Sequence, residues 1–382
     1  MMSPALNPKF YQIKIKIFQG QSLPMMDMSM GFLGKAKIDA YMKLDFKGKK
    51  YRTSTIIQEE NGPPVEWNKE FWLPAQLPVA SPSIDLRLMD KDGVNDEMVG
   101  TLNFSTKEIL ENDAEWAEGY HWKTIYGSPL NQKNTKFKRL MNEHPEYASQ
   151  WKGRVLVQVT KEKTEKPLAK MIDICEDDIT KMKESGALEL KKYTFIAQIG
   201  QAVCLPSDKK YNIKVTVGGH MMVFKPFDQK KASTYKRYGR VDQETIELPY
   251  VNIDDMSKVI VQLMDKEDPV CYWIGSVKDF KDPNPKMNWY PFTPDKCVNK
   301  VTQPFQVGQF SFKMSIHDES RNGEIDFKTQ PAWKKKVPKR SNPVRVRAYI
   351  YQCRDLPAAD AEGTSDPFVK VWDTGATKKL RK

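Results

Sequence analysis

One phrase of sequence occurs three times in this chain: a strand-like stretch, then glutamine, three residues, Leu-Pro and an aspartate. The first and third copies have the same spacing, and the second brings its aspartate one residue early. The copies lie roughly 150 to 190 residues apart, too long a period for a solenoid and typical of tandem domains. The copies are Gln19, Leu23, Pro24 and Asp27; Gln201, Leu205, Pro206 and Asp208; and Gln352, Leu356, Pro357 and Asp360.

Strict alternation of apolar and polar residues predicts many short strands and little helix. Helical periodicity is limited to one turn at Thr106 to Leu110 and a connecting segment at 173–188. The fold class we expect is all-β: tandem antiparallel β-sandwiches, the third truncated. The strands are expected at 11–18, 84–89, 153–159, 193–199, 211–217, 259–264, 309–316 and 344–351.

Changes in composition between the patterned segments predict the domain boundaries. The segment 161–190 has mixed charge and weak patterning, and 318–342 is polar, basic and proline-containing. The expected parts are a first domain with a long insert at 9–160, a linker with helical character at 161–190, a degenerate second domain at 191–317, a basic linker at 318–342, and the start of a third domain at 343–382.

Composition narrows the class of protein. The 382 residues include five cysteines, an odd number without a close pair, which argues against a disulfide framework and a zinc knuckle. No apolar run approaches the ~20 residues that cross a bilayer, and the N-terminus has no secretion-signal pattern. The net charge of +12 suits an anionic lipid or nucleic acid partner. We expect a cytoplasmic, peripheral membrane-associated protein, whose parent chain could carry a membrane anchor.

Five aspartates of the first domain fall in loops at one end of the predicted sandwich. Antiparallel loops bring distant residues together, and clustered carboxylates supply the six to eight oxygens that Ca²⁺ prefers. Repulsion among them would make the empty loops looser. The alternative is that each is an ordinary turn residue, because aspartate favours turns. The candidate metal ligands are Asp27, Asp39, Asp90, Asp92 and Asp96.

These motifs resemble the C2 domain, an eight-stranded sandwich that binds calcium and phospholipid. The matching segments are Leu-Pro-x-x-Asp at the first loop, Pro64 to Asn68 before a strand, and Asp90 to Gly100. The insert from Tyr120 to Val157 and the third start, Val346 to Val371, resemble central C2 domains of ferlins, multi-C2 proteins of membrane fusion and repair.

The resemblance implies a role for each matching acid. Asp27 and Asp39 match the first-loop pair of C2 calcium ligands, and Asp90, Asp92 and Asp96 match the second-loop group. In the third domain Asp360 and Asp366 match the first-loop pair of an incomplete site. The second domain has no matching pair, so we expect a spacer or protein-contact module there. Two departures are Ala40, where the family usually has proline, and a loop about two residues shorter than usual.

The first loop also carries an apolar tip between its two aspartates. A Met-rich tip can enter the interfacial region of a bilayer, and nearby lysines can contact phosphates. The alternative is that these side chains fill the domain's own core. The candidate membrane-contact residues are Met25, Met26, Met28, Phe32, Leu33, Lys35 and Lys37.

The sequence therefore predicts a binding protein and no enzyme, because the histidines lack a serine or cysteine partner at catalytic spacing. The expected function is calcium-dependent binding to anionic phospholipid membranes in a ferlin-like protein of vesicle fusion, trafficking or membrane repair. The alternative is a calcium-independent C2 scaffold for protein contacts. A metal-dependent phosphate-cleaving enzyme would need a base that is not found. Other C2 domains or fusion proteins are further candidate partners, and no nucleic acid is expected.

Overall fold

The computed structural model describes most of the chain, in two compact units at Met1–Trp333 and Lys334–Lys382. The second unit contributes only 349–352 and 369, so the predicted strand at 344–351 lies largely outside the described residues, and those at 349–352 form no strand. The described residues are 8–27, 36–79, 81–93, 95–111, 119–130, 132–144, 150–207, 209–227, 236–238, 241–250, 252–295, 308–324, 327, 349–352 and 369.

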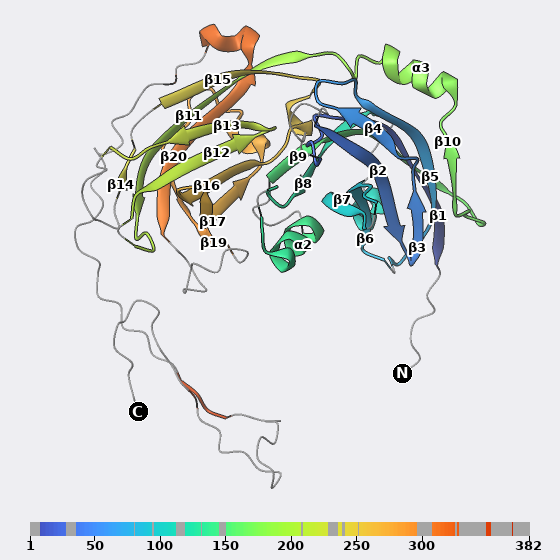
Figure 1. Ribbon diagram of the computed structural model, residues 1–382, viewed down its shortest axis with the longest axis horizontal. Coiled ribbons are helices and arrows are strands. Elements are labelled where there is room, and N and C mark those ends of the chain that lie inside the picture. Colours follow the sequence, from blue (N-terminus) through green and yellow to red (C-terminus); the bar gives the residue numbers. More distant parts are fainter. Residues whose placement is uncertain are drawn as a thin grey trace. The chain divides into compact units, whose positions relative to one another are not determined.

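The first unit consists mainly of antiparallel strands, which confirms the predicted all-β fold (Figure 1). Its first sheet has the strand order β10-β5-β1-β9-β8-β7-β6-β2-β3, with β4 paired to β2. The described strands of the first domain are β1 (Lys9–Gln21), β2 (Lys37–Phe46), β3 (Lys49–Arg52), β4 (Ile56–Glu59), β5 (Val65–Leu77), β6 (Ser83–Asp90), β7 (Glu97–Ser105), β8 (His121–Gly127) and β9 (Gln150–Lys163).

This sheet folds over itself at the β7–β8 junction, where a single residue pair, Thr101 with Tyr126, joins the strands. The two halves therefore share one core. Ile13 and Ile15 of β1 are fully buried in the same cluster as Leu86 of β6. The alternation read from the sequence is thus the alternation between core and outer face.

A glycine closes the end of the sheet where β1 and β9 meet. Gly153 has φ +96°, and a Cβ there would lie 2.7 Å from the carbonyl oxygen of Gln21. Side chains rarely adopt this backbone, so the position needs glycine. The pairing of Gln21 with Arg154 brings the start of β9 to the end of β1, beside the first loop.

The α-helices of the described residues are α1 (Thr106–Glu111), α2 (Thr135–Glu143) and α3 (Glu176–Glu184). The first agrees with the helical turn predicted after Thr106, and the third lies within the helical segment predicted at 173–188. Between β9 and α3, strand β10 (Lys170–Asp173) pairs with β5, so part of the predicted linker extends the first sheet. No helix among the described residues is both long and apolar enough to cross a bilayer.

The second sandwich is built from two further sheets, β14-β11-β20-β18 with β15 paired to β11, and β13-β12-β16-β17-β19. Short 3-10 helices connect some of its strands. Its elements are β11 (Lys191–Val203), β12 (Tyr211–Val217), β13 (His220–Phe224), β14 (Lys236–Arg237), β15 (Val241–Leu248), η2 (Ile253–Asp255), β16 (Val259–Asp265), β17 (Asp268–Gly275), η3 (Val277–Phe280), β18 (Asn288–Pro291), β19 (Thr293–Pro294), β20 (Gln309–Asp318) and η4 (Glu319–Glu324).

The two sandwiches of this unit pack on each other. Phe18, Trp122 and Leu156 of the first domain belong to the hydrophobic cluster that forms the core of the second. The indole N–H of Trp122 donates to the carbonyl oxygen of Ala187, 2.9 Å away. The first sheet therefore buries apolar side chains on both faces around β1, β8 and β9.

Candidate metal centre

Three aspartates converge where β1 ends and β6 ends. Asp27 forms an isolated antiparallel bridge with Lys37, the first residue of β2. Asp90 is the last residue of β6 and pairs with Ala40 of β2. Asp92 follows in the β6–β7 loop. Strand β2 thus lies between the two acidic loops and sets their separation.

Carboxylate oxygens of Asp27, Asp90 and Asp92 all lie within 4.8 Å of one another. Two oxygens that each lie about 2.3 to 2.6 Å from one Ca²⁺ are at most about 5 Å apart, so the spacing fits that ion. Asp90 is only 2 % exposed, and Asp92 is exposed. A cation held here would have a buried floor and an open side.

The electrostatics of the group favour a cation. Burial, together with the charges of Asp27, Asp92 and Asp39, raises the pKa of Asp90 to about 6, although the backbone N–H of Asp39 donates to Asp90 Oδ1 at 2.8 Å and acts in the opposite direction. Burial and neighbouring acids also raise the pKa of Asp92. Two like charges 4.8 Å apart repel by about 3 kcal/mol at an effective dielectric of about 20.

The other two predicted ligands have partners within the protein. The carboxylate of Asp39 lies 3.3 Å from the ammonium of Lys37, which also lies 3.6 Å from Asp27. Asp96 accepts a hydrogen bond of 2.6 Å from the hydroxyl of Tyr41 and lies 3.6 Å from Arg52. Burial and this bond raise the pKa of Tyr41 to about 12. The structure therefore brings three of the five acids together, with Asp39 and Asp96 beside them and paired.

The acids of the later domains do not form a comparable group among the described residues. Asp265 of the second domain lies 2.6 Å from the ammonium of Lys209, and Asp208 lies outside the described residues. Asp360 and Asp366 also lie outside them. Among the described residues, the convergent acidic group thus belongs to the first domain.

The predicted membrane-contact residues are described only in part. Met25 and Met26 are half-buried and pack against the first core, as the alternative interpretation expected. Lys37 is engaged by Asp27 and Asp39. The remaining candidates, Met28, Phe32, Leu33 and Lys35, lie outside the described residues.

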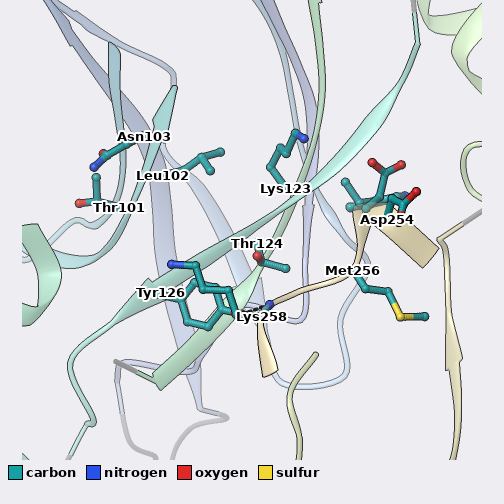
Figure 2. A pocket seen from close by; sticks show the side chains of 11 residues that line it. Thr101, Leu102, Asn103, Lys123, Thr124, Tyr126, Asp254, Met256 and Lys258 are labelled. Carbon is teal, nitrogen blue, oxygen red and sulfur yellow. Dashed lines mark hydrogen bonds between the residues drawn. The ribbon is translucent and has the colours of Figure 1, made fainter. Parts of the chain in front are cut away.

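A pocket of about 340 Å³ lies where β7 and β8 meet the segment around η2 (Figure 2). The backbone N–H of Lys258 donates to the hydroxyl of Tyr126 at 3.0 Å across it. Its two acids are paired, Asp254 with Lys281 at 2.6 Å and Asp255 with His121 at 3.1 Å. The contacts of Tyr126 with Lys258 and of His121 with Asp255 therefore connect the two domains, and both acids of the pocket have a basic partner.

Comparison with known proteins bears on the family of the domain that carries the centre. Residues 11–124 and 344–382 match the C2 domain model. The first match covers the strands and loops that hold all five candidate acids, and the second covers the third repeat. These matches support the C2 family predicted from the motifs for the first domain and for the third start.

Curated relatives include extended synaptotagmin-1 of mouse, 26 % identical over 130 residues, and of human, 25 % identical over 130 residues. The aligned part is 34 % of this chain and 11 % of the mouse protein, so the chain spans about a tenth of that relative. These relatives are extended synaptotagmins and not ferlins, so the ferlin assignment stays a prediction.

A solved structure of two C2 domains, A and B, of extended synaptotagmin 2, with calcium bound, is 14 % identical with a TM-score of 0.28. The alignment covers 82 % of this chain and 98 % of that one. A similarity of this strength gives no information about the metal centre.

The sequence did not predict how three residues around the centre, Lys37, Tyr41 and Arg52, pair with its acids. Lys37, a predicted phosphate contact, also lies within ion-pair distance of two aspartates, Asp27 and Asp39. Tyr41 and Arg52 hold Asp96, and the guanidinium of Arg52 lies 3.8 Å from the centre of the Tyr41 ring. Lys37 and Asp39 stand two residues apart on β2 and so share one face of the strand, whereas no local spacing links Tyr41 and Arg52 to Asp96.

Proposed function

We propose that the first C2 domain binds calcium through Asp27, Asp90 and Asp92 and then docks on anionic phospholipid membranes. The convergence of three carboxylates from two loops carries this proposal. Carboxylate oxygens without nitrogen or sulfur suit a hard cation such as Ca²⁺. Further oxygens can come from Asp39 and Asp96, if their present partners move, and from water.

Calcium would act on the charge of this end of the domain. Bound Ca²⁺ cancels the negative potential of the acidic group, which otherwise repels anionic headgroups. Lys37 would be released from Asp27 and Asp39 and become available for a phosphate. Among the neighbours in sequence, Met28, Phe32 and Leu33 supply apolar side chains, each worth ~1.5 to 3 kcal/mol when buried.

In its wider role we place the chain among ferlin-like proteins of vesicle fusion, trafficking or membrane repair. The motifs of the long insert and of the third start support this finer assignment. The chain would then be a peripheral membrane-binding part, with calcium as its cofactor and anionic phospholipid as its partner.

Co-sedimentation with phosphatidylserine-containing vesicles, in calcium and in chelator, tests the proposal. The full chain should pellet more in calcium, and Asp90→Asn with Asp92→Asn should abolish that increase. Asp254→Asn is the matched control, because this acid lies in the interdomain pocket and should not change the calcium effect. An unchanged calcium effect in the double variant would refute the assigned ligands.

The same experiment separates the rival function, a calcium-independent C2 scaffold for protein contacts. The half-buried Met25 and Met26 and the pairing of Lys37 favour that rival, because both withdraw residues from the membrane. Equal pelleting of the full chain in calcium and in chelator would support it.

A further inference from the structure

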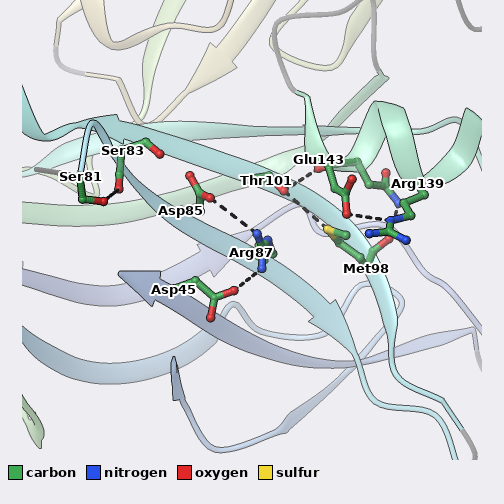
Figure 3. Close-up of polar contacts among 10 residues, drawn as sticks. Asp45, Ser81, Ser83, Asp85, Arg87, Met98, Thr101, Arg139 and Glu143 are labelled. Carbon is green, nitrogen blue, oxygen red and sulfur yellow. Dashed lines mark hydrogen bonds and ion pairs between the residues drawn. The ribbon is translucent and has the colours of Figure 1, made fainter. Parts of the chain in front are cut away.

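Helix α2 is an insertion between β8 and β9 that is fastened to β7. The side chain of Asn134 accepts from the backbone N–H groups of Lys136 and Phe137 and caps the first turn. At the other end Asn142 accepts from the N–H of Ser128 at 2.6 Å, and the hydroxyl of Thr101 donates to the carbonyl oxygen of Asn142 at 2.5 Å. Figure 3 shows the last turn of α2, with Arg139 and Glu143, beside Met98 and Thr101 of β7.

This anchoring places α2 at the end of the domain that carries the acidic group. Lys138 forms an ion pair with Glu97, the first residue of β7. Glu97 is in turn the strand partner of Asp90. Glu97, at the start of β7, thus contacts the helix through Lys138 and is paired with Asp90 of the candidate metal centre.

The exposed side chains of α2 and of the segment just before it are largely basic. Lys133, Lys136 and Arg139 are exposed, and neither lysine has an ion-pair partner among the described residues. Arg139 pairs with Glu143 at 2.9 Å. Leu130, just before the helix, is 50 % exposed. Exposed lysines beside an exposed apolar residue suit the headgroup region of an anionic bilayer.

We propose that Lys136 of α2, together with Lys133 and Leu130 of the segment before the helix, forms a second membrane-contact surface that binds anionic phospholipid without calcium. This second surface deepens the proposed function, and it rests on that function for the orientation of the domain at the membrane. The occupant is a lipid surface, because both lysines are exposed without an ion-pair partner among the described residues and an anionic bilayer supplies the complementary charge. Calcium-loaded loops at the same end would then engage the same membrane, so the two contacts reinforce each other.

The test compares Lys133→Ala with Lys136→Ala in one full-length variant against the wild type, in chelator and about 0.05 M salt, where screening is weak. Each lysine near an anionic surface contributes about fivefold in affinity, so the double variant should bind phosphatidylserine-containing vesicles about 25-fold more weakly. Both side chains are exposed, so folding should not change. The matched control is Lys181→Ala with Lys183→Ala on α3, a helix tied to the middle of β1 by the 2.8 Å ion pair of Lys16 with Asp178.

The result that supports the proposal is loss of chelator-state binding in the α2 variant alone, with binding to phosphatidylcholine vesicles unaffected. Wild-type-like binding of the α2 variant, an equal loss in the α3 control, or no chelator-state binding by the wild type would overturn it. So would loss of binding to an acidic peptide with vesicle binding intact, which would assign the surface to a protein. Asp90→Asn with Asp92→Asn reports on the calcium increment only, so the two proposals fail separately.

Discussion

Substitution of Asp90 by asparagine should stabilise the calcium-free protein. Asp90 is 2 % exposed and shares its surroundings with Asp27 and Asp92. Its pKa is raised from 3.8 to about 6. Each pKa unit corresponds to about 1.4 kcal/mol, so ionised Asp90 costs the fold up to about 3 kcal/mol at pH 7.5. Asparagine keeps an oxygen for the Asp39 N–H and carries no charge, but it buries an amide, so the expected gain is about 2 kcal/mol.

The sign of this effect fixes its pH dependence. The folded-state pKa of Asp90 lies above the unfolded value, so proton binding stabilises the fold fully below pH 3.8 and this contribution is lost as pH rises through about 6. The advantage of asparagine should therefore be largest above pH 7 and should fall by about 2 kcal/mol towards pH 4.

Calcium should reverse the order of stability. An ion at 100 times its Kd stabilises the wild type by about 2.7 kcal/mol, and the variant, which lacks one carboxylate, gains little. Urea unfolding followed by tryptophan fluorescence, with chelator and with calcium, measures both differences. Asp96→Asn is the control, because this acid is satisfied by Tyr41 and Arg52 and its neutralisation should not stabilise. A less stable Asp90→Asn protein in chelator, or full stabilisation of it by calcium, would refute the reasoning.

Three further predictions concern the surroundings of the centre. Lys37→Gln removes the ammonium that neutralises Asp27 and Asp39, so calorimetry should find tighter calcium binding, and weaker binding would contradict the counter-ion role. Gly153→Ala forces a side chain into φ +96° against the Gln21 carbonyl and should cost about 1 to 3 kcal/mol in urea unfolding; Gly48→Ala, at φ +77° in open space, should cost less. Phe18→Ala empties a fully buried position in the core of the second domain and should cost about 3 to 5 kcal/mol, with hydrogen exchange rising in β11 and β20; exchange confined to β1 would argue against a shared core.

The sequence predicted the strands well because burial alternates along them. The period-2 pattern at 11–18 coincides with the burial of Ile13, Ile15 and Ile17 against the core. Other elements left no such signal. Strand β10 is four residues long and is held by pairing with β5, which no local pattern encodes. Helix α2 was not predicted, and the contacts of Asn142 and Lys138 that anchor it to the sheet are tertiary.

The acids of the site divide in the same way. Asp27, Asp90 and Asp92 could be grouped from their loops alone, and the structure brings their carboxylates together. The pair of Lys37 with Asp39 follows the two-residue period of a strand, but Tyr41 and Arg52 reach Asp96 only through the tertiary fold. Whether calcium recruits these two acids as well depends on the strength of those internal pairs.

Backbone hydrogen bonds tie both flanks of the acidic group to strand β2. The N–H of Asp27 donates to the carbonyl oxygen of Lys37 at 3.0 Å, and the N–H of Lys37 donates back at 3.2 Å. The N–H of Lys91 donates to the Asp39 carbonyl oxygen at 2.9 Å, and Asp39 donates to Asp90. These bonds hold the flanks of the site through strand β2 without any ion. At these described flanks calcium binding has little backbone to order, so relief of charge repulsion between the carboxylates is the main source of its free energy there.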